Sequence, residues 1–167
     1  MDNYSEAEKQ IMDCLLSYTR GIDRLDPDAI TAAFHPGALL EGYQPDVFTP
    51  IEDFALPVVE RLKKRYSSTQ HRLSNTKIDF TEEGAIAESY VLAYHVQPAN
   101  EDTPERLWTF SGRYIDYFEN RNNEWRIAER FLRADWTRIE TIDEKMPNKF
   151  IAGARDKSDP VYGQISN

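Results

Sequence analysis

Apolar positions in the first part of the chain recur at the spacing of a helix. Ser5 and Glu8 stand in the order of a capping box, so we expect the first helix to begin near Ser5. Two further helices are predicted, a short one behind the Asp26-Pro27 cap and another from Thr49-Pro50 to about Tyr66. The apolar residues that follow Ser5 would form one stripe on the first helix: Ile11, Leu15, Tyr18 and Ile22.

After Ser67 the pattern changes to aromatic and β-branched residues broken by turn-like segments. Helices followed by an antiparallel meander indicate an α+β fold, in which a strongly bent antiparallel sheet packs with three N-terminal helices. Such a sheet encloses a concave interior, which is the usual place for a ligand. The predicted strands cover residues 70–80, 84–97, 106–120 and 124–138.

Alternation along the last two strands shows which side chains share a face. Trp108, Phe110, Tyr114 and Phe118 lie at even spacing, as expected for one face of a long strand. In the last strand the apolar side changes near Arg130, and a β-bulge at 128–130 would explain the change.

We expect a single domain over residues 1–140 and a C-terminal extension over 141–167. The extension contains Pro147, Gly153, Pro160 and Gly163 with little periodicity. It is predicted to pack on the body or on a neighbouring subunit.

Composition narrows the class of protein. The chain has 167 residues, of which 40% are hydrophobic and 29% charged, as in globular domains with a real core. The net charge of −9 disfavours nucleic acid and anionic membranes as partners. No apolar run approaches a membrane span and no leader is visible, and the single Cys14 cannot form an internal disulfide. A cytoplasmic location is the simplest expectation.

Asp23 and His71 are the candidate catalytic pair. A carboxylate that orients an imidazole makes a general base that works near neutral pH. The alternatives are an Asp23 that faces solvent and a His71 that is a satisfied structural residue. The three histidines have no short ligand spacing, and no glycine-rich phosphate loop is present, so we expect neither metal nor cofactor.

Several motifs together resemble a known family over roughly residues 5–138. They are Tyr18-x4-Asp23, His71 with Asn75, Gly112-Arg-Tyr114-x-Asp116, and Trp125-Arg-Ile127-x-x-Arg130. The chain is similar in these to the SnoaL-like branch of the nuclear transport factor 2-like superfamily. The resemblance implies a cone-shaped α+β barrel. It also implies chemistry of the kind seen in cofactor-free dehydratases and a dehydrochlorinase, although other members are cyclases or isomerases and fold alone does not fix activity.

The resemblance also implies roles for individual residues. His71 would remove a proton beside a carbonyl while Asp23 holds its tautomer, and Tyr18 and Arg130 would bind the substrate oxygen. Tyr18 stands where the dehydrochlorinase has a lysine, which argues against halide elimination. Tyr18 also continues the apolar stripe, so a plain core role stays open, and Arg130 could instead pair with a carboxylate at a strand edge. The expected substrate-binding residues are His95, Tyr94, Trp108, Phe110 and Asn75.

The sequence thus predicts a cofactor-independent, dehydratase-like lyase that acts on a small apolar cyclic or polycyclic molecule. An isomerase or polyketide-type cyclase could use the same base. A non-catalytic ligand-binding module or an accessory subunit are further alternatives. Tyr and Phe on the outer face of the sheet lead us to expect a homo-oligomer, either a trimer or a dimer.

Overall fold

The computed structural model describes residues 2–163, with side-chain surroundings from Ser5 onward. Three helices and six strands follow one another along the chain, and a short 3₁₀ turn, η1, covers Pro160–Tyr162. The helices are α1 (Asp2–Arg24), α2 (Pro27–Ala32) and α3 (Ile51–Arg65). The strands are β1 (Phe34–Glu41), β2 (Phe48–Pro50), β3 (Ser68–Phe80), β4 (Ala85–Gln97), β5 (Arg106–Arg121) and β6 (Glu124–Thr141). None of the helices in the described part of the chain is long and apolar enough to cross a membrane.

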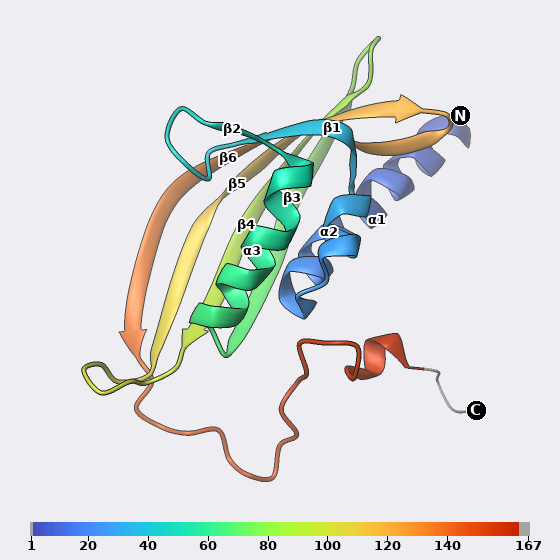
Figure 1. The fold of residues 1–167 in the computed structure, drawn as a ribbon. Helices are drawn as coiled ribbons and strands as arrows, with labels where there is room; N and C mark the ends of the chain where they lie inside the picture. Colours follow the sequence, from blue (N-terminus) through green and yellow to red (C-terminus); the bar gives the residue numbers. More distant parts are fainter. Residues whose placement is uncertain (1, 164–167) are drawn as a thin grey trace.

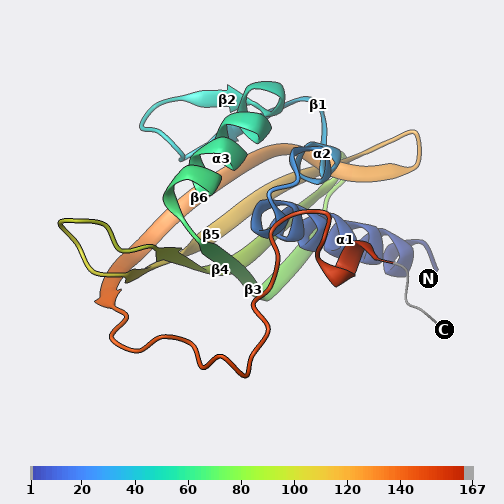
Figure 2. The same cartoon turned by 60° about the horizontal axis from the view of Figure 1, so that its bottom comes forward.

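The six strands form one bent sheet in the order β2-β1-β6-β5-β4-β3, with the helices on its concave side (Figures 1 and 2). The α+β fold is therefore confirmed, and β3 to β6 form the antiparallel meander expected from the sequence. β1 and β2 were not predicted, and β1 pairs with β6 in parallel, which makes the sheet mixed. The edge strands β2 and β3 are not hydrogen-bonded to each other, so the barrel is open.

Of the three helix starts expected from the sequence, only the one at Asp26 has the side-chain cap that was predicted. α1 begins at Asp2, so Ser5 lies inside its first turns and does not cap it. α3 begins at Ile51 without a side-chain cap, and the Glu52 carboxylate instead accepts the amide of Gly37 at 2.8 Å. The cap at Asp26 is confirmed, because its side chain accepts the amide of Ala29 at 3.2 Å.

The predicted bulge in the last strand is present. Tyr117 pairs with Glu129 and Phe118 pairs with Ile127, so one residue of β6, Ala128, has no partner on β5. The extra residue turns both Ile127 and Arg130 inward, and both are fully buried.

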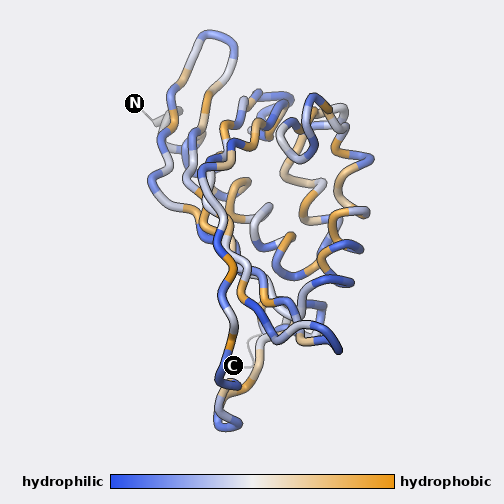
Figure 3. The backbone as a smooth tube through the Cα atoms, turned by 90° about the vertical axis from the view of Figure 1, so that its left-hand side faces the viewer, coloured by the Kyte–Doolittle hydropathy of each residue, from blue (hydrophilic) through white to orange (hydrophobic). Residues whose placement is uncertain are grey.

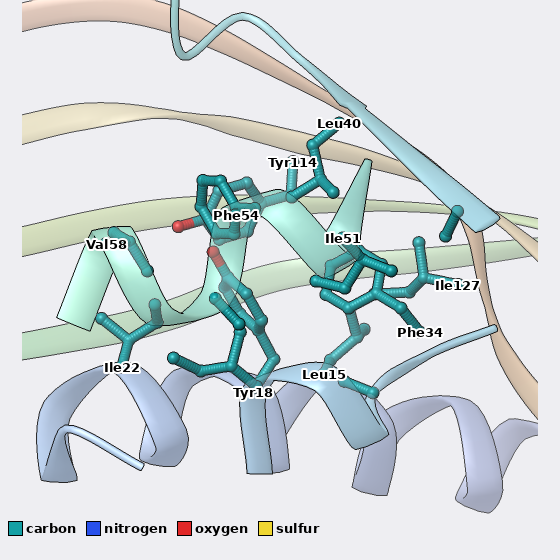
Figure 4. Close-up of a cluster of buried hydrophobic side chains, with 14 of the residues drawn as sticks. Leu15, Tyr18, Ile22, Phe34, Leu40, Ile51, Phe54, Val58, Tyr114 and Ile127 are labelled. Carbon is teal, nitrogen blue, oxygen red and sulfur yellow. The ribbon is translucent and has the colours of Figure 1, made fainter. Parts of the chain in front are cut away.

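The core lies between the helices and the concave face of the sheet, as the hydropathy trace in Figure 3 and the close-up in Figure 4 show. Tyr18 and Ile22 point from α1 towards Phe54 and Val58 of α3, and Leu15 points towards Ile51 and Phe34. The apolar stripe of α1 is therefore buried as predicted, with exposures of 3% or less from Ile11 to Ile22.

The described part of the C-terminal extension, residues 142–163, returns to the body beside α1 and α2 (Figure 2). The Asp26 carboxylate, already the α2 cap, also accepts Lys157 Nζ and the Tyr162 hydroxyl. Asp159 pairs with Arg24 at 3.3 Å. These contacts fasten the extension to the end of α1 and the start of α2.

Candidate active site

A cavity of about 370 Å³ opens between α1, α3 and the inner face of β3, β4 and β5. Its size falls in the range of small-molecule sites, roughly 300–1,000 Å³. Its walls are mainly aromatic and aliphatic, and the polar groups are two imidazoles, several tyrosine hydroxyls and the side chains of Arg61 and Arg65 from α3. The lining includes Tyr18, Ile22, Tyr43, Phe54, Val58, Leu62, Tyr66, His71, His95, Trp108, Phe110 and Tyr114.

The structure brings Asp23 and His71 together through two hydrogen bonds. His71 Nδ1 lies 2.8 Å from Asp23 Oδ1, and the His71 backbone amide donates to Asp23 Oδ2 at 2.9 Å. An ionised carboxylate can only accept, so Nδ1 carries the proton and Nε2 keeps a lone pair. Nε2 makes no hydrogen bond to any residue in the described range 2–163, and His71 lines the cavity.

The fold explains why these two residues meet. β3 is an edge strand, so the amides on its outer side have no strand to bind. Asp23, in the last turn of α1, satisfies one of these amides with one oxygen and orients the ring with the other. The side chains of the pair are 14% and 9% exposed, so solvent competes little with the contact.

His95 is the second imidazole of the cavity. His71 pairs with Ala93 across β3 and β4, so His95 lies diagonally two residues further on the same face. The two rings are 5.3 Å apart in an edge-to-face arrangement. Burial, followed by the nearby charge of His71, lowers the pKa of His95 to about 4, which leaves it neutral at pH 7. Its Nδ1 is buried and has no hydrogen-bond partner among the described residues.

Two tyrosine hydroxyls form a polar point on an otherwise apolar wall. Tyr18 and Tyr43 meet with their oxygens 3.1 Å apart. Burial raises the pKa of Tyr43 well above its ordinary value, so its hydroxyl keeps its proton. One hydroxyl donates to the other, which leaves one proton of the pair available to a ligand oxygen.

Arg130 is not part of the cavity wall, contrary to its expected place in the pocket. It is completely buried and donates to both oxygens of Asp116, at 2.6 and 2.8 Å. Its guanidinium carbon lies 4.0 Å from the ring centre of Tyr18 and 4.1 Å from that of Tyr114. The ion pair therefore supports two cavity-lining tyrosines from behind. The alternative prediction, that Arg130 pairs with a carboxylate at a strand edge, is also wrong, because its partner is the buried Asp116.

The other expected site residues divide according to strand alternation. Trp108 and Phe110 line the cavity together with His95. Tyr94 points to the opposite face, where the Arg72 guanidinium lies 5.1 Å from its ring. Asn75 also lies away from the cavity, exposed at a register shift of β3 with a φ of 48°. Tyr94 faces away because it is the sequence neighbour of His95 on a strand, whereas Asn75, at even spacing from His71, is displaced by the register shift.

Sequence reasoning missed several residues of the site. Tyr43 lies in the turn between β1 and β2, a region without a periodic signal. Tyr66, just beyond α3, was placed only as a helix end, yet its ring stacks parallel to Trp108 at 6.3 Å. Within residues 2–163, no three His, Cys, Asp or Glu side chains are grouped as the ligands of a metal ion would be.

The fold and the cavity define an α+β domain with an apolar cavity between its helices and its sheet, into which a few polar side chains from both layers reach. The sequence matches the SnoaL-like domain over residues 3–131. The chain therefore belongs to the SnoaL-like family.

Solved structures share this fold. A provisionally assigned scytalone dehydratase from Novosphingobium aromaticivorans is 23% identical, with a TM-score of 0.69 over 91% of this chain and 100% of that one. A hexachlorocyclohexane dehydrochlorinase from Novosphingobium barchaimii is 15% identical, with a TM-score of 0.73 over 86% and 97%. A protein of unknown function with a cystatin-like fold from Nostoc punctiforme is 20% identical, with a TM-score of 0.60 over 77% and 90%. At these identities the likeness establishes the fold alone. No curated protein matches the sequence at a significant level.

Proposed function

We propose that the protein is a cofactor-independent, dehydratase-like lyase that removes a carbon-bound proton from a small apolar cyclic molecule. The observation that carries the proposal is the Asp23–His71 pair, in which the carboxylate binds both the ring and the amide of the histidine. The apolar cavity of about 370 Å³ supports a substrate with one to a few rings. The two dehydratase and dehydrochlorinase neighbours share the fold and are consistent with elimination chemistry.

The proposed reaction begins at His71 Nε2. Its lone pair takes the proton beside a substrate carbonyl, and the C–H electrons move into an enolate. Asp23 stabilises the imidazolium that forms. A hydroxyl on the next carbon then leaves as the enolate collapses to a carbon–carbon double bond, and the His71 imidazolium returns its proton to that oxygen. Water is released, and the His71 imidazole returns to its starting protonation state.

The tyrosine pair would bind the enolate oxygen. The free proton of the Tyr18–Tyr43 pair can donate to a carbonyl whose negative charge grows during proton removal. The oxygen-binding role first expected of Arg130 passes in this scheme to these hydroxyls, because Arg130 lies behind them. Neutral His95 can accept or donate a hydrogen bond to a substrate hydroxyl beside His71.

Carbon-bound proton exchange tests the proposal without knowledge of the leaving group. The protein is incubated in D₂O with a panel of mono- and bicyclic ketones and β-hydroxyketones, and loss of the α-proton signal is followed by NMR. We expect exchange of at least one member of the panel, with elimination visible where a β-hydroxyl is present. An isomerase or cyclase would exchange the proton but release no water from a β-hydroxyketone.

Two variants and one control sharpen the assay. His71→Gln removes the base and should abolish exchange. Asp23→Asn should do so too. If its amide oxygen keeps the His71 backbone contact, its NH₂ faces Nδ1 and moves the ring proton to Nε2. The control is His35→Gln, because His35 binds the Glu119 carbonyl at 2.9 Å and is absent from the cavity lining. Exchange that survives in His71→Gln would exclude His71 as the base. Ligands that bind across the panel without any exchange would favour a non-catalytic binding module.

A further inference from the structure

Arg155, in the C-terminal extension, reaches the three segments that hold the dyad and one wall of the cavity. Its Nη1 donates to the Tyr66 carbonyl at 2.6 Å and its Nη2 to the Thr69 hydroxyl at 3.1 Å. Its Nε contacts the carbonyl of Asp23 itself at 3.5 Å. Arg155 lies beyond residue 131, where the family match ends, so the family assignment gives this residue no role.

Each of these partners either belongs to the site or lies within two residues of one of its members. Asp23 is in the last turn of α1, and Tyr66 directly follows α3 and lines the cavity. Thr69 lies two residues before His71 on the same face of β3, and it pairs with His95 across the strands. One guanidinium therefore connects the ends of two helices with the start of an edge strand. The end of α3 and the start of β3 already follow one another in the chain, so the connection that Arg155 adds is the one to the end of α1.

The chemistry of the contact suits an arginine. The last carbonyls of a helix have no partner within the helix and carry its negative dipole end, so a cation that donates there is favourable. A planar guanidinium offers five donors in a fixed fork, which lets one side chain bind three separated oxygens. Burial lowers the pKa of Arg155, and the charge of Asp23 acts in the opposite direction, so the two side chains are electrostatically coupled. Arg155 forms no ion pair with a carboxylate among the described residues.

We propose that Arg155 is a positioning residue for the dyad, which fixes the Asp23 end of α1 against β3 so that the carboxylate stays on His71. The proposal rests on the proposed function for its catalytic meaning. It assigns the extension a part in the site, through one side chain that does not itself contact the substrate.

A simple anchoring role for Arg155 makes a different prediction. Lys157 and Tyr162 fasten the same extension to Asp26, and neither contacts Asp23, Tyr66 or Thr69. If Arg155 served only to hold the extension, loss of Lys157 would affect the dyad as much as loss of Arg155. Lys157→Ala is therefore the matched control.

The test uses the full-length protein and two NMR signals of His71. The first is hydrogen–deuterium exchange of the His71 backbone amide, which donates to Asp23 Oδ2. The second is the low-field signal of the ring proton on Nδ1, which faces Asp23 Oδ1. Melting temperatures of all variants are recorded beside them, to separate local from global effects.

We expect Arg155→Ala to accelerate exchange of the His71 amide by about ten- to hundredfold, the usual range for lost hydrogen bonds to a charged group. The low-field ring signal should broaden or vanish, while the signals of Lys157→Ala remain as in the parent protein. Arg155→Lys keeps the charge but not the forked arrangement of donors. Its acceleration of His71 amide exchange should therefore lie between those of Arg155→Ala and Lys157→Ala, at about threefold or more. In the proton-exchange assay the turnover should follow the same order.

Equal effects of Arg155→Ala and Lys157→Ala would overturn the proposal, as would unchanged His71 signals in Arg155→Ala. If Arg155→Ala does not fold, Arg155→Lys decides, and unchanged signals in that variant overturn the proposal. The NMR readout needs no substrate. A protein that holds its dyad through Arg155 but exchanges no carbon-bound proton would therefore contradict the proposed function and leave the positioning contact established.

Discussion

The buried pair of Asp116 and Arg130 provides a quantitative test of the architecture behind the cavity. Replacing Asp116 by Ala removes both acceptors of the Arg130 guanidinium, at 2.6 and 2.8 Å. The charge would then face only the rings of Tyr18 and Tyr114, about 4 Å away. Burial lowers the pKa of Arg130, but the charge and the hydrogen bonds of Asp116, together with the nearby tyrosines, outweigh this and hold the pKa well above its ordinary value. Asp116→Ala removes that compensation, but a guanidinium keeps its proton at neutral pH, so the variant leaves a buried charge without a carboxylate partner unless water enters the site.

The expected cost follows from the complete burial of both side chains. Removing one partner of a buried ion pair leaves an uncompensated charge and destabilises a protein by about 3–5 kcal/mol. With a urea slope of about 2 kcal/mol per M, the unfolding midpoint should fall by roughly 1.5–2.5 M. The measurement is urea unfolding of Asp116→Ala, followed by tryptophan fluorescence and by circular dichroism.

The matched control is a second ion pair, between Arg113 of β5, the strand that also carries Asp116, and Glu88 of β4. Arg113 pairs with Glu88 at 2.6 Å, but both side chains are about a third or more exposed. Glu88→Ala should therefore move the midpoint far less than Asp116→Ala, although the distances are alike. The double variant Asp116→Leu with Arg130→Met should regain much of the lost stability, because no unpaired charge remains. Similar midpoints for Asp116→Ala and Glu88→Ala would refute the reasoning that burial, and not distance, sets the value of the pair.

Three further outcomes are expected. His95 binds a proton only near pH 4 when folded and near 6.5 when unfolded, so stability that is complete above about pH 6.5 should fall by up to about 3 kcal/mol as the pH drops towards 4. A His95→Gln variant followed by urea titrations at each pH should lack that part of the slope, and an unchanged slope would contradict the assignment. Gly42→Ala should cost about 1–3 kcal/mol in thermal unfolding, because its φ is 95° and the new Cβ would lie 2.2 Å from the Leu132 carbonyl oxygen. Gly37→Ala, with a φ of 77° and no atom within 4 Å, should cost less, and equal costs would show that the close approach is unimportant. The protein should sediment as a dimer or trimer, and Trp136→Lys, at a side chain 51% exposed, should weaken the assembly; a monomer at 50 μM would contradict this.

Local patterns predicted most of the fold because they are determined by local physics. The strand alternation around Trp108 and Phe110 depends only on the two-residue repeat of a strand, and the structure reproduces it. The bulge near Ala128 was predicted from a change of apolar side and confirmed by the register. The cap at Ser5 failed because helix formation continued past a favourable start, which a capping preference cannot prevent.

The site was harder to predict because its members meet through tertiary contacts. Asp23 and His71 were singled out from their chemistry and from a family resemblance, and the structure places them in contact. The neighbours of Arg130 could not be found from sequence. Its partner Asp116 stands opposite it on the adjacent strand only in the bulged register, and the aromatic faces around it come from separate elements. Tyr43 gave no signal at all, because a turn residue has no periodic neighbours to reveal which way it points.

The unpaired residue at Ala128 has a consequence for how this scaffold can diverge. Deleting that one position would remove this register shift and turn the β6 residues that follow it, as far as the second shift at Asp135, to the opposite face of the sheet. The Arg130 side chain would then leave the interior for the outer surface, and its place behind the tyrosines would pass to a neighbour of different chemistry. A single-codon deletion in β6 would thus replace the charged side chain behind the cavity-lining tyrosines in one event, while the strand pairing on either side of the deletion is kept.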